Sequence, residues 1–307
     1  MSVTLSQART SVYWILREVE NSTAYPYTLV DWFINSAQLR YCSGLLNNPL
    51  TKENVTKGKL PFLNKDAYFS NIAPTYTTTA VAVWATTIPA TTTNYDTTGT
   101  LFIAWNTIPY TGKTSTSFTG CSNVLFAFES GMQISPAFTL PTDFMSPIEI
   151  VYKDRMKLDC LNYDEIYEYL KSYKGNYADY NNSNVWWSLT TYTSPFYTIK
   201  DSTYLILWNL NQTGGMVHLR YEKLPATLSA TTDTLTIPND TYAKNIITQY
   251  AAGEMLFYRW EEVRAAQILN FAIGQAKESY KFYDNQSFET QSGIRFSVGK
   301  SGKRNNF

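Results

Sequence analysis

The sequence has little charge, one histidine and only three cysteines. Of its 307 residues 16% are charged, and 25 basic side chains balance 25 acidic ones, which gives a formal net charge of zero at pH 7. Tight binding to nucleic acid is not expected, because affinity for phosphates grows with the number of cations presented. The same balance leaves little repulsion between copies of the chain, which suits a large assembly.

The cysteines, Cys42, Cys121 and Cys160, are far apart and show no metal-ligand spacing. They indicate neither a zinc site nor a disulfide framework, and we expect them to be buried small apolar residues. No stretch approaches the roughly 18 consecutive apolar residues of a membrane span, and the N-terminal residues do not resemble a signal peptide. The sequence therefore predicts no membrane attachment.

Aromatic and hydroxyl side chains are abundant instead. Aromatic residues make up 16% of the chain, with 24 Tyr and 8 Trp, and Thr-rich runs occupy its middle. Much of the surface is therefore expected to be polar without being charged.

Both ends of the chain have the apolar spacing of amphipathic helices. Thr4 and Gln7 form a capping box at the first of them, and Gly44 supplies the left-handed position that ends the second. At the other end of the chain, Asn239 or Asp240 is the predicted N-cap. The predicted helices span about 4–20, 30–43, 239–257 and 259–283.

Between these helices, short runs of β-branched and aromatic residues bounded by Pro, Gly or Asn predict strands. The low-complexity stretch 86–100 is expected to be an exposed loop or hairpin tip, with disorder as the alternative. A short helix is predicted over 162–173. The strands that follow it suit an antiparallel meander, in which the glycine-containing loop 211–215 joins the last two strands as a hairpin.

These patterns predict an α+β fold, in which the N- and C-terminal helices form a helical bundle with an antiparallel β meander and a large inserted all-β module. The expected bundle core consists of Val12, Leu16, Phe33, Ile34, Ile246 and Tyr250. The predicted domains are an N-terminal helical hairpin (1–59), the Thr-rich β module (60–140), a mixed region with the meander (141–238), the C-terminal helices (239–285) and an extended tail (286–307).

Few residues are candidates for catalysis. His218 lies in an alternating segment, and because no partner for a triad or a metal site is specified, an ordinary strand position is favoured. The run "TGKTSTS" (111–117) does not fit a phosphate-binding loop, because Thr107 occupies the position of the leading glycine and Pro109 interrupts the loop.

A carboxylate cluster is the remaining candidate. Asp159, Asp164, Glu165 and Glu168 could supply the paired carboxylates of a tail glycosidase. On a helix, however, Asp164 and Glu168 lie on one face with Glu165 beside them, which is more typical of a solvated surface. We therefore expect no enzyme, and no catalytic, cofactor-binding or metal-binding residue.

From the strand around His218 onward, the order of elements resembles that of the head–tail adaptor proteins of tailed bacteriophages, also called connector, neck or tail-tube gatekeeper-like proteins. In that family a strand ending near Tyr and Pro leads to an L-S-x-x-x-D element, a hydrophobic-P-x-x-Y helix start and a long helix with small residues. The matching residues here are Leu219, Tyr221, Pro225, Leu228, Ser229, Asp233, Ile237, Pro238, Tyr242, Ile246, Ala251, Ala252 and Gly253.

Two upstream elements are similar to the same family. One is carried by Leu140, Pro141, Asp143, Phe144 and Pro147, and the other by Ile34-Asn35-Ser36-Ala37, in place of a recurring Ile-Asn-x-Ala. The resemblance covers roughly 1–46, 140–170 and 195–283. The region 60–140 does not match a compact adaptor and resembles an insertion.

The resemblance implies a structural virion protein, made in the host cytoplasm and placed in the virion at the junction of neck and tail. It would be a ring subunit that joins the portal to the tail and lines the channel through which DNA leaves during ejection. The implied partners are the portal protein, tail or further neck proteins, and copies of itself in a ring, a dodecamer in the family. DNA would pass without specific binding, and no cofactor or membrane is implied.

An alternative function is a carbohydrate- or receptor-binding tail protein of the virion. The aromatic density of the segment "NVWWSLTTYTSPFY" motivates it, because Tyr and Trp rings stack on sugars.

The last eleven residues, 297–307, contain glycines and no apolar periodicity, which is typical of a frayed end. In the adaptor family the C-terminal segment commonly grips the portal, so the resemblance implies a docking tail. Its basic groups and its aromatic anchor would be Lys300, Lys303, Arg304 and Phe307.

Overall fold

The computed structural model describes residues 2–103, 106–161, 195–208 and 210–292, and the side chains of 286–292 are outside that description. The fold is mixed α+β with several antiparallel sheets, as the sequence predicts. The chain divides into two compact units. Unit 1 combines Met1–Asn64 with Leu224–Phe307, and unit 2 is Lys65–Lys223.

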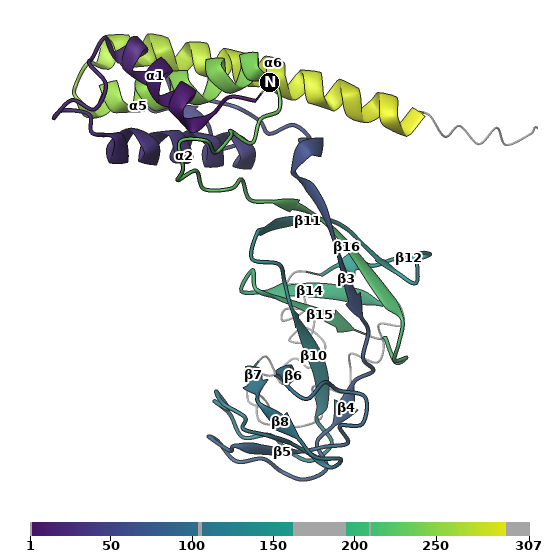
Figure 1. The fold of residues 1–307 in the computed structure, drawn as a ribbon. Helices are drawn as coiled ribbons and strands as arrows, with labels where there is room; N and C mark the ends of the chain where they lie inside the picture. The colour runs from purple at the N-terminus through teal and green to yellow at the C-terminus, as the bar shows by residue number, and fades with distance from the viewer. Residues whose placement is uncertain (1, 104–105, 162–194, 209, 293–307) are drawn as a thin grey trace, which may run out of the picture. The chain divides into compact units, whose positions relative to one another are not determined.

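Unit 1 contains four helices of ten or more residues in the described part of the chain. They are α1 (Leu5–Leu16), α2 (Tyr27–Ser43), α5 (Gln249–Tyr258) and α6 (Glu262–Ser292). Helix α5 packs against α1, α2 and α6, and the four lie side by side (Figure 1). Shorter elements are β1 (Asn47–Asn48), β2 (Glu53–Asn54), a 3-10 turn (Pro61–Leu63), α4 (Asp240–Tyr242) and a π-helical turn, η4 (Ala243–Thr248).

Local sequence sets several ends of these helices. Both hydrogen bonds of the Thr4–Gln7 capping box are present at α1, and Gly44 ends α2 with a φ of 72°. Helix α1 stops at Leu16, earlier than predicted, because Arg17 takes the left-handed conformation with a φ of 61°. Helix α6 continues to Ser292, so residues 286–292 are helical, whereas the sequence predicted an extended tail there.

The helical packing depends on small residues of α5. Ala251 and Ala252 are fully buried, and a Cβ atom added to Gly253 would lie 2.8 Å from side-chain atoms of Leu269 on α6. Such an approach is possible only where one helix presents no side chain. The six residues expected in one core, Val12, Leu16, Phe33, Ile34, Ile246 and Tyr250, are all buried in unit 1.

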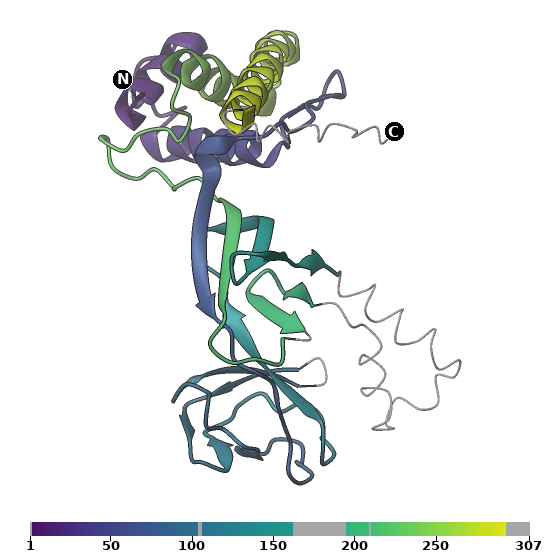
Figure 2. The same cartoon turned by 90° about the vertical axis from the view of Figure 1, so that its right-hand side faces the viewer.

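The described residues of unit 2 form three sheets. A seven-stranded sheet has the order β13 (Asp159–Cys160), β14 (Phe196–Lys200), β15 (Tyr204–Trp208), β10 (Gln133–Thr139), β6 (Gly99–Ile103) and β7 (Asn106–Tyr110), with β4 (Thr75–Tyr76) also on β10. A four-stranded sheet has the order β12 (Met156–Lys157), β11 (Phe144–Tyr152), β16 (Met216–Lys223) and β3 (Asn64–Ser70). A three-stranded sheet has the order β5 (Thr87–Pro89), β9 (Ser117–Thr119) and β8 (Gly112–Lys113). Strands β3, β16 and β11 can be followed side by side in Figure 2.

Strand pairing differs from the predicted division of the β region. Strand β10 pairs with β15, and β16 lies between β11 and β3, so strands from 60–140 and from 141–238 share two sheets. Within 60–140, the β5–β9–β8 sheet is separate, but β3, β6, β7 and β10 belong to sheets that also contain strands from 141–238. The predicted hairpin across 211–215 is also wrong, because β15 and β16 belong to different sheets. Alternate residues of β16, including Val217 and Leu219, are buried in a cluster that also contains Leu205 of β15.

Two further expectations hold only in part. Most of the stretch 86–100 is exposed, as expected, but Ile88, Ala90, Thr92 and Tyr95 are buried, and the Tyr95 hydroxyl donates to the Ile134 carbonyl at 2.9 Å. Cys42 and Cys121 are buried as expected, but Cys160 is exposed.

The predicted short helix over 162–173 lies outside the described residues. Among the helices described, none is long and apolar enough to cross a membrane.

Candidate functional site

The residues that carry the family resemblance meet where a connecting segment, residues 224–238, crosses helix α2. This segment leads from the end of β16 to the N-cap Asn239 and contains no regular strand or helix. Its backbone groups therefore need partners elsewhere, because a buried N–H or C=O without a hydrogen bond is costly. The partners come from two amide side chains of α2 and from the start of α1.

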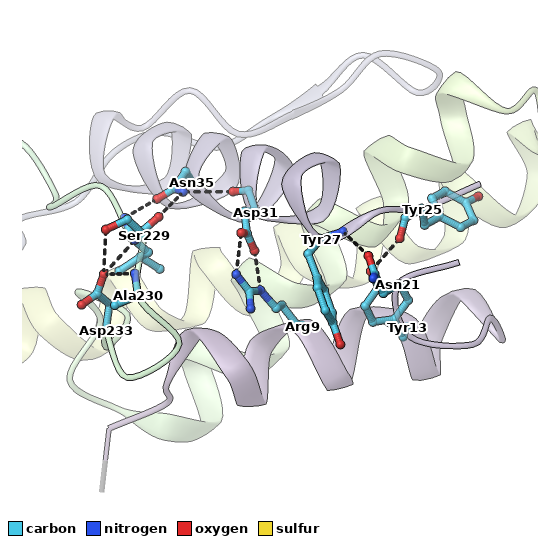
Figure 3. A network of polar contacts seen from close by, with 11 residues as sticks. Arg9, Tyr13, Asn21, Tyr25, Tyr27, Asp31, Asn35, Ser229, Ala230 and Asp233 are labelled. Atoms are coloured by element: carbon cyan, nitrogen blue, oxygen red, sulfur yellow. Dashed lines mark hydrogen bonds and ion pairs between the residues drawn. The ribbon is translucent and has the colours of Figure 1, made fainter. Parts of the chain in front are cut away.

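The first amide is Asn35. Its Nδ2 donates to the carbonyls of Leu228 and Asp31, each at 3.0 Å, and its Oδ1 accepts from the backbone N–H of Leu228 at 2.8 Å. Asn35 thus pairs with both backbone groups of one residue of the connecting segment, as a neighbouring strand would (Figure 3). Leu228 itself is buried, so the pairing fixes an apolar anchor as well.

The second amide is Gln38, one turn further along the same face of α2. Its Nε2 donates to the Ala226 carbonyl at 3.0 Å, and its Oε1 accepts from the Thr236 N–H at 2.8 Å. Gln38 is only 1% exposed, so these bonds satisfy a polar side chain that has no access to water. Together, the two amides hold the connecting segment at three of its residues. We call Asn35, Gln38 and these partners the amide clamp.

Asp233 closes a turn within the connecting segment. Its Oδ2 accepts from the backbone N–H groups of Ser229 at 2.7 Å and Ala230 at 2.8 Å (Figure 3). These backbone hydrogen bonds hold the pKa of Asp233 below its usual value, because they favour the ionised carboxylate. The Ser and Asp of the L-S-x-x-x-D element therefore have a structural role here.

The same segment also caps helix α1. Leu5 N–H donates to the Asp233 carbonyl at 2.7 Å, Ser6 N–H donates to the Thr231 carbonyl at 3.2 Å, and Leu235 N–H donates to the Val3 carbonyl at 2.8 Å. The first N–H groups of a helix have no partner inside it. The connecting segment supplies two of these missing partners, so it ties both N-terminal helices together.

An ion pair joins α1 to α2 next to the clamp. Arg9 donates through Nε and Nη2 to the two carboxylate oxygens of Asp31, each at 2.6 Å, and its guanidinium lies 4.8 Å from the centre of the Tyr27 ring. Both side chains are more than three-quarters buried. This bidentate geometry fixes the angle between the helices as well as their distance.

The remaining family-like residues form a second cluster in unit 2. Asp143 accepts from the Tyr221 hydroxyl at 2.8 Å and from Lys65 Nζ at 2.7 Å, and the rings of Phe144 and Tyr221 lie 5.6 Å apart. The sequence element around Asp143 therefore fastens the beginning of β11 to the ends of β16 and β3. Its residues also have a structural role.

His218 is the candidate catalytic residue whose surroundings are described in most detail. His218 Nε2 lies 2.8 Å from Asp66 Oδ1, and its ring stacks on Tyr68 at 4.7 Å. The hydrogen bond from His218 lowers the pKa of Asp66, and Arg220 Nε contributes at 3.4 Å. Among the described contacts of His218, no hydroxyl or thiol accepts or donates a hydrogen bond.

Most of the other candidate residues lie outside the described part of the chain. Asp159 is exposed on β13, and Asp164, Glu165 and Glu168 lie outside the described residues, as do Lys300, Lys303, Arg304 and Phe307 of the tail. Over the described ranges, no group of three or more His, Cys, Asp or Glu side chains is placed to hold a metal ion. No protein-family model matches the chain, and no curated protein matches it either.

Sequence reasoning identified Asn35 through the resemblance but missed Gln38, Arg9 and Lys65. Gln38 had a readable signal, because it shares a helix face with the apolar residues Ile34 and Tyr41 and is therefore a polar residue in a core position. For the two cations, partners 22 and 78 residues away decide the role, and no local pattern contains that information.

We expect Asn35→Ala to destabilise the chain by about 2 kcal/mol or more, because it leaves both backbone groups of buried Leu228 without a partner. Denaturant melts followed by helical circular dichroism measure the change. Asn245→Ala is the matched control, since that side chain makes one 3.4 Å contact with Gln275. Equal melts for the two variants would contradict the role given to the clamp.

The Asp233 turn predicts a pH dependence. A carboxyl group whose folded pKa is lowered stabilises the fold above its unfolded pKa of about 4 and loses this contribution as pH falls through the folded value. Acid titration is therefore expected to destabilise the natural chain more than Asp233→Asn, and only below about pH 4. If the melting temperatures of the natural chain and of Asp233→Asn fall equally as the pH is lowered, the stabilising role of the Asp233 carboxylate is disproved.

Proposed function

We propose that this chain is a structural virion protein of a tailed bacteriophage, a head–tail adaptor subunit. In this role it forms a ring with its copies, joins the portal to the tail and lines the DNA exit channel. We further propose that unit 1 acts as a helical bundle closed by both ends of the chain, and that unit 2 is an elaborated β insertion. No step of this role requires a catalytic residue or a cofactor.

The observation that carries the proposal is the amide clamp. The Ile-Asn-x-Ala element on α2 and the L-S-x-x-x-D element lie 193 residues apart, and Asn35 joins them through two hydrogen bonds to Leu228. Chance similarity would not require these separated elements to pair with each other. Their pairing supports a common architecture, and the resemblance gives that architecture an adaptor role.

Exposed apolar groups of unit 1 support assembly. Trp14, Trp260 and Val263 are 81%, 85% and 77% exposed, and the neighbouring cations are already paired, Arg259 with Glu18 and Arg264 with Glu261. Exposed apolar surface with internally neutralised charge is typical of surfaces that contact another protein. In a ring, each subunit contributes two different contact faces, and these side chains belong to one of them.

A glycan- or receptor-binding tail protein is the second candidate. Trp84 in unit 2 is 70% exposed and has a φ of 62°, which is unusual for a large side chain. Its backbone N–H donates to the Val124 carbonyl, and Phe126, two residues further along that segment, is 57% exposed. Such side chains are suited to stacking on sugar rings.

Oligomeric state on and off the portal distinguishes the two candidates. We expect the purified chain to be monomeric alone and to form a ring only when the portal protein of the same phage is added, as measured by mass photometry and negative-stain microscopy. A chain that never joins the portal, but is retained by a glycan array, would favour the second candidate.

A further inference from the structure

A cavity of about 440 Å³ lies in unit 2 where the turn after β11 approaches the segment after β15. Its apolar walls include Tyr152, Met156 and Leu210, and its polar groups come from Lys153, Arg155, Asn211 and Gln212. Its volume falls in the lower part of the range for small-molecule sites, roughly 300–1,000 Å³. None of the adaptor-like residues lines it.

Two cations project from one turn at the edge of this cavity. Lys153 Nζ donates to Gln212 Oε1 at 2.7 Å and lies 5.2 Å from the centre of the Tyr152 ring, so its position is fixed by contacts on two sides. Arg155 is exposed and forms no ion pair with a carboxylate among the described residues. With Asp154 as the one acid between them, the turn carries one net positive charge.

Tyr152, one of the residues that line the cavity, carries an unsatisfied polar atom. It is 6% exposed, and within the described part of the chain its hydroxyl is buried without a hydrogen-bond partner. The end of its ring packs against Gly215, so Tyr152 contributes apolar ring surface to the cavity.

We propose that this cavity binds an anionic sugar, a ligand with several hydroxyl groups and one carboxylate or phosphate. The planar guanidinium of Arg155 can bind either a carboxylate or a phosphate through two parallel hydrogen bonds, and Lys153 adds a further donor. The amides of Asn211 and Gln212 can both donate to and accept from hydroxyl groups. The Tyr152 ring, Met156 and Leu210 provide apolar surface for the C–H face of the sugar. This site is independent of the adaptor role.

Titration calorimetry of the full chain with three probes tests the proposal. Glucuronate is a sugar with a carboxylate, glucose 6-phosphate is a sugar with a phosphate, and glucose is the uncharged sugar used for comparison. We expect at least one of the two anions to bind at least about tenfold more tightly than glucose, since a charged hydrogen bond contributes roughly 1.5–3 kcal/mol. The anion that binds more tightly shows whether the site prefers a carboxylate or a phosphate.

Arg155→Gln is expected to weaken binding of that anion by about tenfold or more, with an unchanged melting temperature because the side chain is exposed. Lys157→Gln is the matched control, since Lys157 is on the same hairpin but pairs with Glu149 outside the cavity. The side-chain amide NMR signals of Asn211 and Gln212 are expected to shift with the bound anion. The proposal is overturned if neither anion binds at about 50 mM, if glucose binds equally well, if Arg155→Gln binds as the natural chain does, or if the shifts lie elsewhere.

Discussion

Replacing Ile246 with alanine is expected to destabilise unit 1 by about 2–5 kcal/mol, and Leu16→Ala by a similar amount. Ile246 is fully buried within the π-helical turn, and Leu16 is 4% exposed at the end of α1. Each replacement removes buried apolar atoms and leaves a cavity that close-packed neighbours fill only in part. Because α1 and the π-helical turn contact each other, both losses weaken the same core.

Denaturant melts that follow the helical circular dichroism signal measure these losses, since the long helices among the described residues belong to unit 1. The control is Leu45→Ala, a truncation in the same unit at a side chain that is 65% exposed. It is expected to stay within about 0.5 kcal/mol of the natural chain. If Leu16→Ala and Ile246→Ala are also nearly neutral, the N- and C-terminal helices do not share one core.

Deleting Lys300 to Phe307 is expected to abolish or strongly weaken incorporation into portal rings while leaving the melting temperature of the isolated chain unchanged. The deleted residues lie outside the described part of the chain, and the prediction rests on their sequence. Lys300, Lys303 and Arg304 offer cations for an acidic surface, and Phe307 offers an aromatic anchor for a pocket. We propose that these residues bind the portal, so their loss is expected to change assembly and not the melting of the isolated chain.

Co-sedimentation of the chain with purified portal rings measures the effect of the deletion. A full-length variant with Lys300, Lys303 and Arg304 all replaced by Gln separates the contribution of charge from that of Phe307. Its remaining binding is expected to change little as salt is raised, whereas binding of the intact chain is expected to fall. If the truncated chain assembles as well as the intact one, the docking surface lies elsewhere, on the helices.

Local signals in the sequence predicted the helix ends best. The Thr4–Gln7 capping box and the Gly44 stop are both present, because caps depend on side chains within a few residues of the helix end. The end of α1 was predicted too late. Apolar spacing continues to Val19, but the left-handed backbone of Arg17 ends the helix, and nothing in the spacing shows that conformation.

The β region was predicted less well, because strand partners are chosen by contacts between distant residues. Strand β10 meets β15 across an interval that contains the whole of β11, and β16 leaves its sequence neighbour to pair with β11. The stretch 86–100 reads as a polar loop, yet Ile88 and Tyr95 anchor it in the core. The amide clamp is of the same kind, since the local pattern around Gln38 shows a buried polar group but cannot show its partner.

The proposed place of this protein in the virion is tested most directly by electron microscopy of the phage that encodes it, with particles labelled by an antibody to the chain. An adaptor ring predicts label confined to the junction between the filled head and the tail, around the tail axis. Label on the fibres or at the distal end of the tail would contradict the adaptor role and favour a receptor-binding protein.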